Sequence, residues 1–143
     1  MSGPEEQLAD RRAGVEGRVP GLTVAELRGM LERHEPVAIL DVRPEAERWD
    51  WSIPGSIHRD AYSALRAGDP SALSDLEVPT GQPVVTVCAA GRTSEIAAVQ
   101  LRQRGVYAFS LVGGMKAWSL AWNIAELGAP RATLIQFRRT GKG

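Results

Sequence analysis

The chain has 143 residues, 43% of them hydrophobic, which suits one compact domain with its own buried core. Its 17 basic and 17 acidic side chains cancel, which argues against nucleic acid or an anionic membrane surface as a partner. The single cysteine excludes an internal disulfide and thiolate-rich metal sites, and the two histidines, His34 and His58, lie far apart. Because no signal segment and no apolar stretch of roughly 20 residues is present, we expect a soluble cytoplasmic protein without a metal.

The first part of the chain predicts a leader, a short strand and a helix. Residues 1–14 are small, polar and charged without periodicity, as is typical of a flexible leader. Residues 15–19 predict a short edge strand before Pro20-Gly21. A helix then starts over residues 22–26, because Thr23 and Glu26 form a capping box, and we expect it to end near residues 34–36.

The next part predicts a buried strand followed by polar residues. Residues 37–40 are apolar and deliver Asp41 and Arg43 at the carboxyl end of this strand, where the ligand sites of open α/β sheets collect. Pro44 permits a short helix over residues 45–49. Residues 53–57 predict a turn into a short strand, and residues 61–67 a helical fragment.

The last clear elements alternate between strand and helix. Residues 84–87 form an apolar β-branched run, typical of a strand buried on both faces of a parallel sheet. A helix follows over residues 93–104, a strand over 107–112, and a second helix that Gly113-Gly114 opens. This alternation predicts a doubly wound α/β sheet with its site at the carboxyl ends of the strands.

Cys88 lies in the turn between the strand at 84–87 and the helix that follows. There, free backbone N–H groups and the positive end of the helix dipole favour negative charge, so that a thiolate would be stabilised. The competing interpretation is a small buried hydrophobe, because free cysteine is among the most buried residue types. The glycine-bearing loop and the helix start favour a reactive thiol.

Several landmarks occur in one order along the chain. They are Leu40-Asp41-Val42-Arg43, Glu47, Ile53-Pro54-Gly55-Ser56-Ile57, Cys88-x-x-Gly91 with Thr93-Ser94, and Gly113-Gly114-Met115-x-x-Trp118. Together they resemble the rhodanese-homology domain of the sulfurtransferases, and we assign residues 15–127 to it. The resemblance implies a five-stranded, mostly parallel sheet with helices on both faces, and a persulfide carried on Cys88.

Three departures from the family pattern bear on the site. Trp51-Ser52 stands where many members have a glycine-histidine pair. The usual loop resembles Cys-x-x-Gly-x-Arg, whereas here Arg92 comes one position early and Thr93 takes the place of the arginine. Phosphatases of this fold have a loop one residue longer, with arginine where this chain has Ser94. A phosphatase or an arsenate reductase is therefore our third hypothesis, after the two that follow below.

The resemblance implies a sulfurtransferase that needs no metal or organic cofactor. Cys88 would take sulfane sulfur from a small donor, thiosulfate or a persulfide, and pass it to a thiol acceptor or cyanide. The alternative is a non-catalytic module that senses sulfur or delivers it to a protein partner or fused domain. Asp41 would hold the Cys88 loop in shape through charge-assisted hydrogen bonds. The expected substrate-binding residues are Ala89, Ala90, Gly91, Arg92, Thr93, Ser94 and Arg43.

Residues 128–143 form a separate tail with strand-like residues near their middle. They could add an edge strand to the sheet or begin a following domain. Residues 134–143 resemble the opening strand of the metallo-β-lactamase-fold domain that follows rhodanese domains in some fusion enzymes. The chain would then be the rhodanese module of such a fusion.

Overall fold

The computed structural model describes residues 20–127 of the chain. The predicted leader at 1–14, the strand at 15–19 and the tail at 128–143 lie outside the described residues. The elements in chain order are β1 (Gly21–Leu22), α2 (Val24–Glu32), β2 (Ala38–Asp41), α3 (Glu45–Asp50), β3 (Ile57–His58), α4 (Tyr62–Arg66), β4 (Val84–Val87), α5 (Thr93–Gln103), β5 (Ala108–Leu111) and α6 (Gly114–Leu127).

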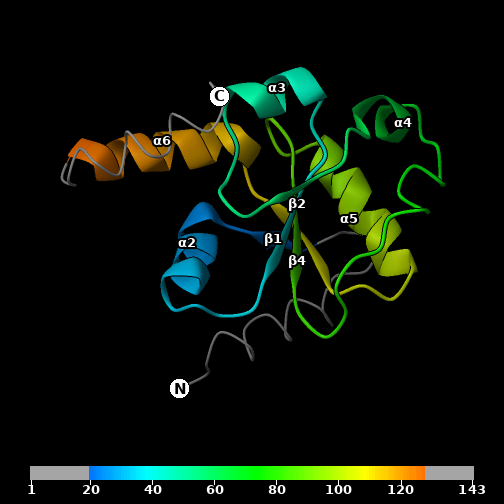
Figure 1. The fold of residues 1–143 in the computed structure, drawn as a ribbon, viewed down its shortest axis with the longest axis horizontal. Helices are drawn as coiled ribbons and strands as arrows, with labels where there is room; N and C mark the ends of the chain where they lie inside the picture. The colour runs from blue at the N-terminus through cyan, green and yellow to red at the C-terminus, as the bar shows by residue number, and fades with distance from the viewer. Residues whose placement is uncertain (1–19, 128–143) are drawn as a thin grey trace.

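The five strands form one sheet in the order β1-β5-β4-β2-β3, and every neighbouring pair is parallel. Figure 1 shows α2 and α6 on one side of this sheet and α4 and α5 on the other. This arrangement confirms the predicted α/β fold with helices on both faces. All residues of the central strand β4 and of its neighbour β5 are buried, as expected for a sheet covered on both faces.

Side-chain alternation along the central strands divides the core into two clusters. Val85, Val87, Phe109 and Leu111 pack with residues of α2 and α6. Their neighbours in sequence point the other way, so that Cys88 packs in the second cluster with residues of α5. The period of two along β4 therefore places the thiol on the α5 side of the sheet.

The first helix begins as predicted and ends earlier than predicted. The Thr23 hydroxyl accepts from the N–H of Glu26 (3.1 Å), and the Glu26 carboxylate accepts from the N–H of Thr23 (2.9 Å), which completes the capping box. The helix ends at Glu32 because His34 takes a positive φ of 57° and the N–H of Glu35 returns to the carbonyl of Met30 (2.9 Å).

The prediction for Leu22 was wrong, because Gly21–Leu22 is a strand rather than a helix start. Gly21 pairs with Ser110 and Leu22 with Leu111, so that β1 forms the edge of the sheet beside β5. Two residues are too short to show any periodicity, and only the pairing with β5 identifies them as a strand. The other elements predicted within residues 20–127 are present, with ends displaced by one or two residues.

Candidate active site

Cys88 follows the last residue of β4 and lies on the loop that leads into α5. Its side chain is buried, with 3% of its surface exposed. The Cys88 Sγ accepts hydrogen bonds from the backbone N–H of Gly91 (3.1 Å) and of Ser94 (3.2 Å). Two backbone donors on one sulfur form a site that favours the anionic form of that sulfur.

The start of α6 holds the other side of this loop. The N–H of Met115 donates to the carbonyl of Cys88 (2.8 Å), and the N–H of Lys116 donates to the carbonyl of Ala89 (3.0 Å). Gly114 has no room for a Cβ, which would overlap the Cys88 carbonyl oxygen and lie 2.8 Å from the carbonyl of Ala89. The carbonyls of the loop therefore point toward α6, while N–H groups of the same loop point toward the sulfur.

One serine hydroxyl contacts the Cys88 sulfur, and a second serine hydroxyl contacts the first. The Ser94 Oγ lies 3.4 Å from the Cys88 Sγ and 2.8 Å from the Ser110 Oγ. Thr86 donates its hydroxyl to the carbonyl of Ser94 (2.7 Å) and so holds the first turn of α5 against β4. The Ser94 side chain thus contacts the thiol, whereas the residue at the helix N-cap is Arg92, which makes no side-chain capping bond.

Ser110 is a site residue that our sequence analysis missed. It lies on β5 with 3% of its surface exposed. The only local signal is one hydroxyl in an otherwise apolar strand. Its contact with Ser94 depends on the register of β4 beside β5, which the local pattern of residues does not reveal.

Asp41 and Arg43 form a buried ion pair at the carboxyl end of β2. The Arg43 Nη2 lies 2.7 Å from the Asp41 Oδ2, and Arg43 also donates to the carbonyl of Trp51. Arg48 approaches the same carboxylate (3.4 Å) and donates to Ser56. These contacts correct our expectation for Asp41, because among the described residues its carboxylate bonds the segment after β2 rather than the Cys88 loop.

Two pockets open beside the loop and share no lining residue. The front pocket, about 480 Å³, is lined by Arg43, Glu47, Asp50, Trp51, Ala89, Met115, Lys116, Ser119 and Leu120. The back pocket, about 360 Å³, is lined by Gly21, Ala90, Gly91, Arg92, Glu95, Ser110, Val112 and Gly113.

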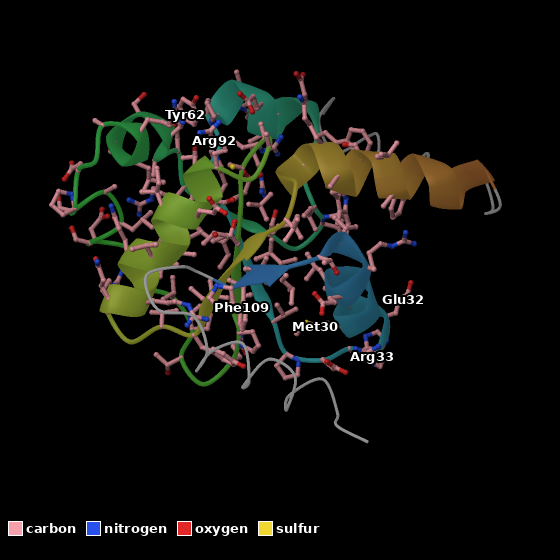
Figure 2. All side chains as sticks on the ribbon, turned by 180° about the vertical axis from the view of Figure 1, so that it is seen from behind. Met30, Glu32, Arg33, Tyr62, Arg92 and Phe109 are labelled. Carbon is pink, nitrogen blue, oxygen red and sulfur yellow. The ribbon has the colours of Figure 1, made fainter. Side chains whose placement is uncertain are left out.

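The two candidate arginines therefore belong to different pockets. Arg43 is buried and contributes to the front pocket, whereas Arg92 is exposed and contributes to the back pocket. Figure 2 labels Arg92 at the end of the molecule where α5 begins. Thr93 is buried beside it, and Ala90 lies on the same side of the loop, facing the back pocket.

The tryptophans near the site differ in their burial. Trp118 is buried in the core, and Trp51 lines the front pocket. Trp49, on α3, has 59% of its surface exposed. His58 contacts the carbonyl of Arg43 through its Nε2 (2.8 Å).

Neither a metal centre nor a membrane span is found in the part of the chain that the structure describes. Over residues 20–127 no three or more histidine, cysteine, aspartate or glutamate side chains gather as a metal site would require. The helices of the same range are too short or too polar to cross a bilayer.

Comparison with known proteins places this geometry in a family. The Rhodanese-like domain family matches residues 23–121. A rhodanese-related protein from Thermoplasma volcanium superposes with a TM-score of 0.56 at 25% identity, over 78% of this chain and 95% of that one. A rhodanese-like domain protein from Staphylococcus aureus gives a TM-score of 0.56 at 27% identity, over 69% and 90% of the two chains.

A third solved structure carries a different description. It is a protein of unknown function from Rhodopseudomonas palustris, described as a possible tyrosine phosphatase, with a TM-score of 0.57 at 25% identity over 91% of this chain and 94% of that one. No curated protein matches the chain. Because the family match covers well over half of its length, the chain belongs to the Rhodanese-like domain family.

Proposed function

We propose that the protein is a sulfurtransferase that carries sulfane sulfur on Cys88 between a small donor and a thiol acceptor or cyanide. One observation carries the proposal, namely the two backbone N–H groups, of Gly91 and Ser94, that donate to the Cys88 Sγ. A sulfur held in this way is suited to be both a nucleophile and a leaving group, since each role requires a stabilised thiolate.

In the first step, the Cys88 thiolate attacks the outer sulfur of thiosulfate or of a persulfide. A new bond forms between the two sulfur atoms, and the donor's own sulfur–sulfur bond breaks. Sulfite, or the thiolate of the donor, leaves with the electron pair. Cys88 is then a persulfide, and its outer sulfur carries the negative charge.

The loop would bind this outer sulfur through the backbone of residues 89–94. The carbonyls of Cys88 and Ala89 are already bonded by the N–H groups of Met115 and Lys116, so that they do not compete for the site. Donors fixed before the reaction stabilise developing charge without further rearrangement of the protein. Arg43 in the front pocket offers a cation for an anionic donor such as thiosulfate.

In the second step, the acceptor thiolate or cyanide attacks the outer sulfur. The bond from that sulfur to the Cys88 Sγ breaks, and Cys88 leaves as a thiolate, which restores the starting enzyme. The same two N–H groups stabilise the leaving thiolate. This double displacement includes no step on a metal or an organic cofactor.

A phosphatase is the second candidate, since the Rhodopseudomonas palustris structure is described as a possible tyrosine phosphatase. The residue at position 94 weighs against it in this chain. Position 94, where phosphatases of this fold have arginine, is a serine whose hydroxyl lies against the thiol. Hydrolysis of an aryl phosphate that is lost in Cys88→Ser would support the phosphatase instead.

The proposal is tested by the formation of thiocyanate from thiosulfate and cyanide. We expect turnover by the natural sequence, no turnover above background by Cys88→Ser, and unchanged turnover by Ser74→Ala, which alters an exposed serine in the loop after α4. Equal rates for the natural sequence and Cys88→Ser would contradict the proposal. A persulfide that forms but passes only to a protein thiol would favour the sulfur-delivery module.

A further inference from the structure

Two serine hydroxyls and the thiol of Cys88 form one connected chain inside the protein. The chain runs from the Cys88 Sγ to the Ser94 Oγ (3.4 Å) and from there to the Ser110 Oγ (2.8 Å). Ser94 is fully buried, and 3% of Ser110 is exposed where it lines the back pocket. Buried polar groups of this kind require a partner for each donor and acceptor.

Each hydroxyl has one proton to donate, so the direction of the hydrogen bonds can follow the charge on the sulfur. When the Cys88 sulfur is neutral, its S–H donates to the Ser94 Oγ, and Ser94 donates to Ser110. When the sulfur is a thiolate, it attracts the proton of Ser94, and Ser110 then donates to Ser94. The direction of both hydroxyls therefore follows the charge on the sulfur.

We propose that Ser110 is a positioning residue that acts through Ser94 to stabilise the anionic form of Cys88. A hydroxyl that itself accepts a hydrogen bond is a stronger donor, so that Ser110 strengthens the bond from Ser94 to the thiolate. The third group on the sulfur is thus the Ser94 hydroxyl of α5, and its support comes from Ser110 on β5, a strand distant in sequence from the Cys88 loop.

The two arrangements would alternate during sulfur transfer. Cys88 is a thiolate before it attacks the donor, and its Sγ is neutral while it carries the outer sulfur of the persulfide. This part of the inference rests on the proposed function. Ionisation of the free thiol, in which the S–H bond breaks and water takes the proton, occurs without any sulfur donor and can be tested alone.

Charged groups also surround the site and could influence its response to pH. Among the described residues, none of their side chains hydrogen-bonds to Cys88, Ser94 or Ser110. They are Arg43, Glu47, Asp50 and Lys116 at the front pocket, Arg92 and Glu95 at the back pocket, and Asp41 and His58, which contact Arg43. Ser110 therefore acts on the sulfur through Ser94 alone.

The experiment is the rate of Cys88 alkylation by iodoacetamide between pH 5 and pH 10. This reaction needs a thiolate but no sulfur donor, so that its outcome is independent of sulfur transfer. The variants are Ser110→Ala, which removes the hydroxyl, and Ser110→Thr, which keeps it. Ser52→Ala is the control, since Ser52 is equally buried at 3% exposure but lies on a different segment. Thermal unfolding of each variant checks its fold.

We expect the Ser110→Ala rate to fall about threefold at neutral pH and to recover fully at high pH, where every thiol is ionised. Ser110→Thr and Ser52→Ala should follow the natural sequence at every pH. The inference is overturned if Ser110→Ala matches the natural sequence, if its rate falls equally at all pH values, or if folded Ser110→Thr behaves like Ser110→Ala. Loss of thiocyanate formation with the expected alkylation result would contradict the proposed function and leave this inference standing.

Discussion

Backbone groups, more than charged side chains, surround the sulfur of Cys88. Its Sγ accepts from two N–H groups, and its own carbonyl accepts from the N–H of Met115. Such an environment depends on the path of the chain more than on the identity of the side chains. Glycines at points of close approach are therefore the residues on which the site depends most.

Replacement of Gly114 by alanine is predicted to disable the site. The new Cβ would overlap the Cys88 carbonyl, and the backbone there has a φ of +58°. We expect at least tenfold slower thiocyanate formation and a loss of about 1–3 kcal/mol in the free energy of unfolding. Kinetics and urea unfolding measure the two effects.

Gly105→Ala is the matched control for that experiment. Gly105 also has a positive φ, of +87°, but its Cβ would meet no atom within 4 Å. The variant should lose about 1 kcal/mol of stability and keep its rate of sulfur transfer. If Gly114→Ala transfers sulfur as fast as Gly105→Ala, the close approach of α6 does not shape the loop.

Residue-scale prediction from the sequence depends on how local the signal is. Cys88 was singled out as the candidate nucleophile because a strand, a glycine-bearing loop and a helix start surround it in the sequence. Ser110 was missed because its role depends on a neighbouring strand and on the first turn of α5. Asp41 differs from Ser110, because its ion-pair partners Arg43 and Arg48 lie on the segment that directly follows it in sequence.

At the scale of elements, the carboxyl end of β2 is joined to α3 and to the turn before β3 by one buried carboxylate. Asp41 has 1% and the Arg43 side chain 6% of its surface exposed. Arg48 extends the network from α3 to Ser56. Arg43 and Trp51 both line the front pocket, so that this network also shapes the entrance to the site.

Arg43→Met is predicted to destabilise the protein by about 3 kcal/mol, because it leaves the more distant Arg48 as the remaining cationic partner of the buried Asp41 carboxylate. Arg59→Met, which breaks the more exposed pair of Arg59 with Asp75, should cost much less. Chemical denaturation compares the two. Equal losses would mean that the buried pair has no special structural role. The double variant Asp41→Asn/Arg43→Met should regain part of the loss.

The capping box of α2 gives a second prediction at this scale. Thr23→Ala removes the hydroxyl that bonds Glu26 and should lower the free energy of unfolding by about 1 kcal/mol. Thr80→Ala, at an exposed turn, serves as the control and should change little. A Thr23→Ala variant as stable as the control would show that the cap is dispensable.

The sequence predicted those helices and strands whose own residues carry a local signal. The capping box, the buried run of β4 and the glycine after α5 are local signals, and each of these elements is present. The strand β1 has only two residues, and only its partner β5 makes it a strand. The turn that ends α2 was also missed, because its His34 is neither glycine nor asparagine.

At the scale of the whole molecule, acid should weaken the fold through exposed carboxylates on the α4–β4 connection. Hydrogen bonds from Ser71 lower the pKa of Asp69 below 3.8, and a hydrogen bond from Arg59 lowers the pKa of Asp75 below the same value. A carboxylate with a lowered folded-state pKa stabilises the protein above its unfolded-state pKa, and this contribution is lost as the pH falls through the folded value.

The double variant Asp69→Asn/Asp75→Asn should therefore lose less stability between pH 5 and pH 3 than the natural sequence does. Urea unfolding at the two pH values gives the comparison. Glu77→Gln, a change of an exposed carboxylate on the same connection, provides the control. Identical losses for the double variant and the natural sequence would exclude these two aspartates from the acid response.

The architecture as a whole places the loop that follows Cys88 between two pockets. The parallel sheet brings the ends of β4, β2 and β5 to one edge, and α5 and α6 both begin there. Cys88, the Asp41–Arg43 pair and Ser110 thus come together from three strands. The order of the sheet could be predicted only through the resemblance to a family, because strand neighbours are not encoded in local patterns.

The central claim is that Cys88 carries sulfur, and intact-protein mass spectrometry tests it most directly. After incubation with thiosulfate and removal of the excess, the natural sequence should gain the mass of one sulfur atom, and a thiol reductant should remove it. Cys88→Ser should gain nothing. No gain with thiosulfate or with any persulfide donor, or an equal gain by Cys88→Ser, would contradict the claim.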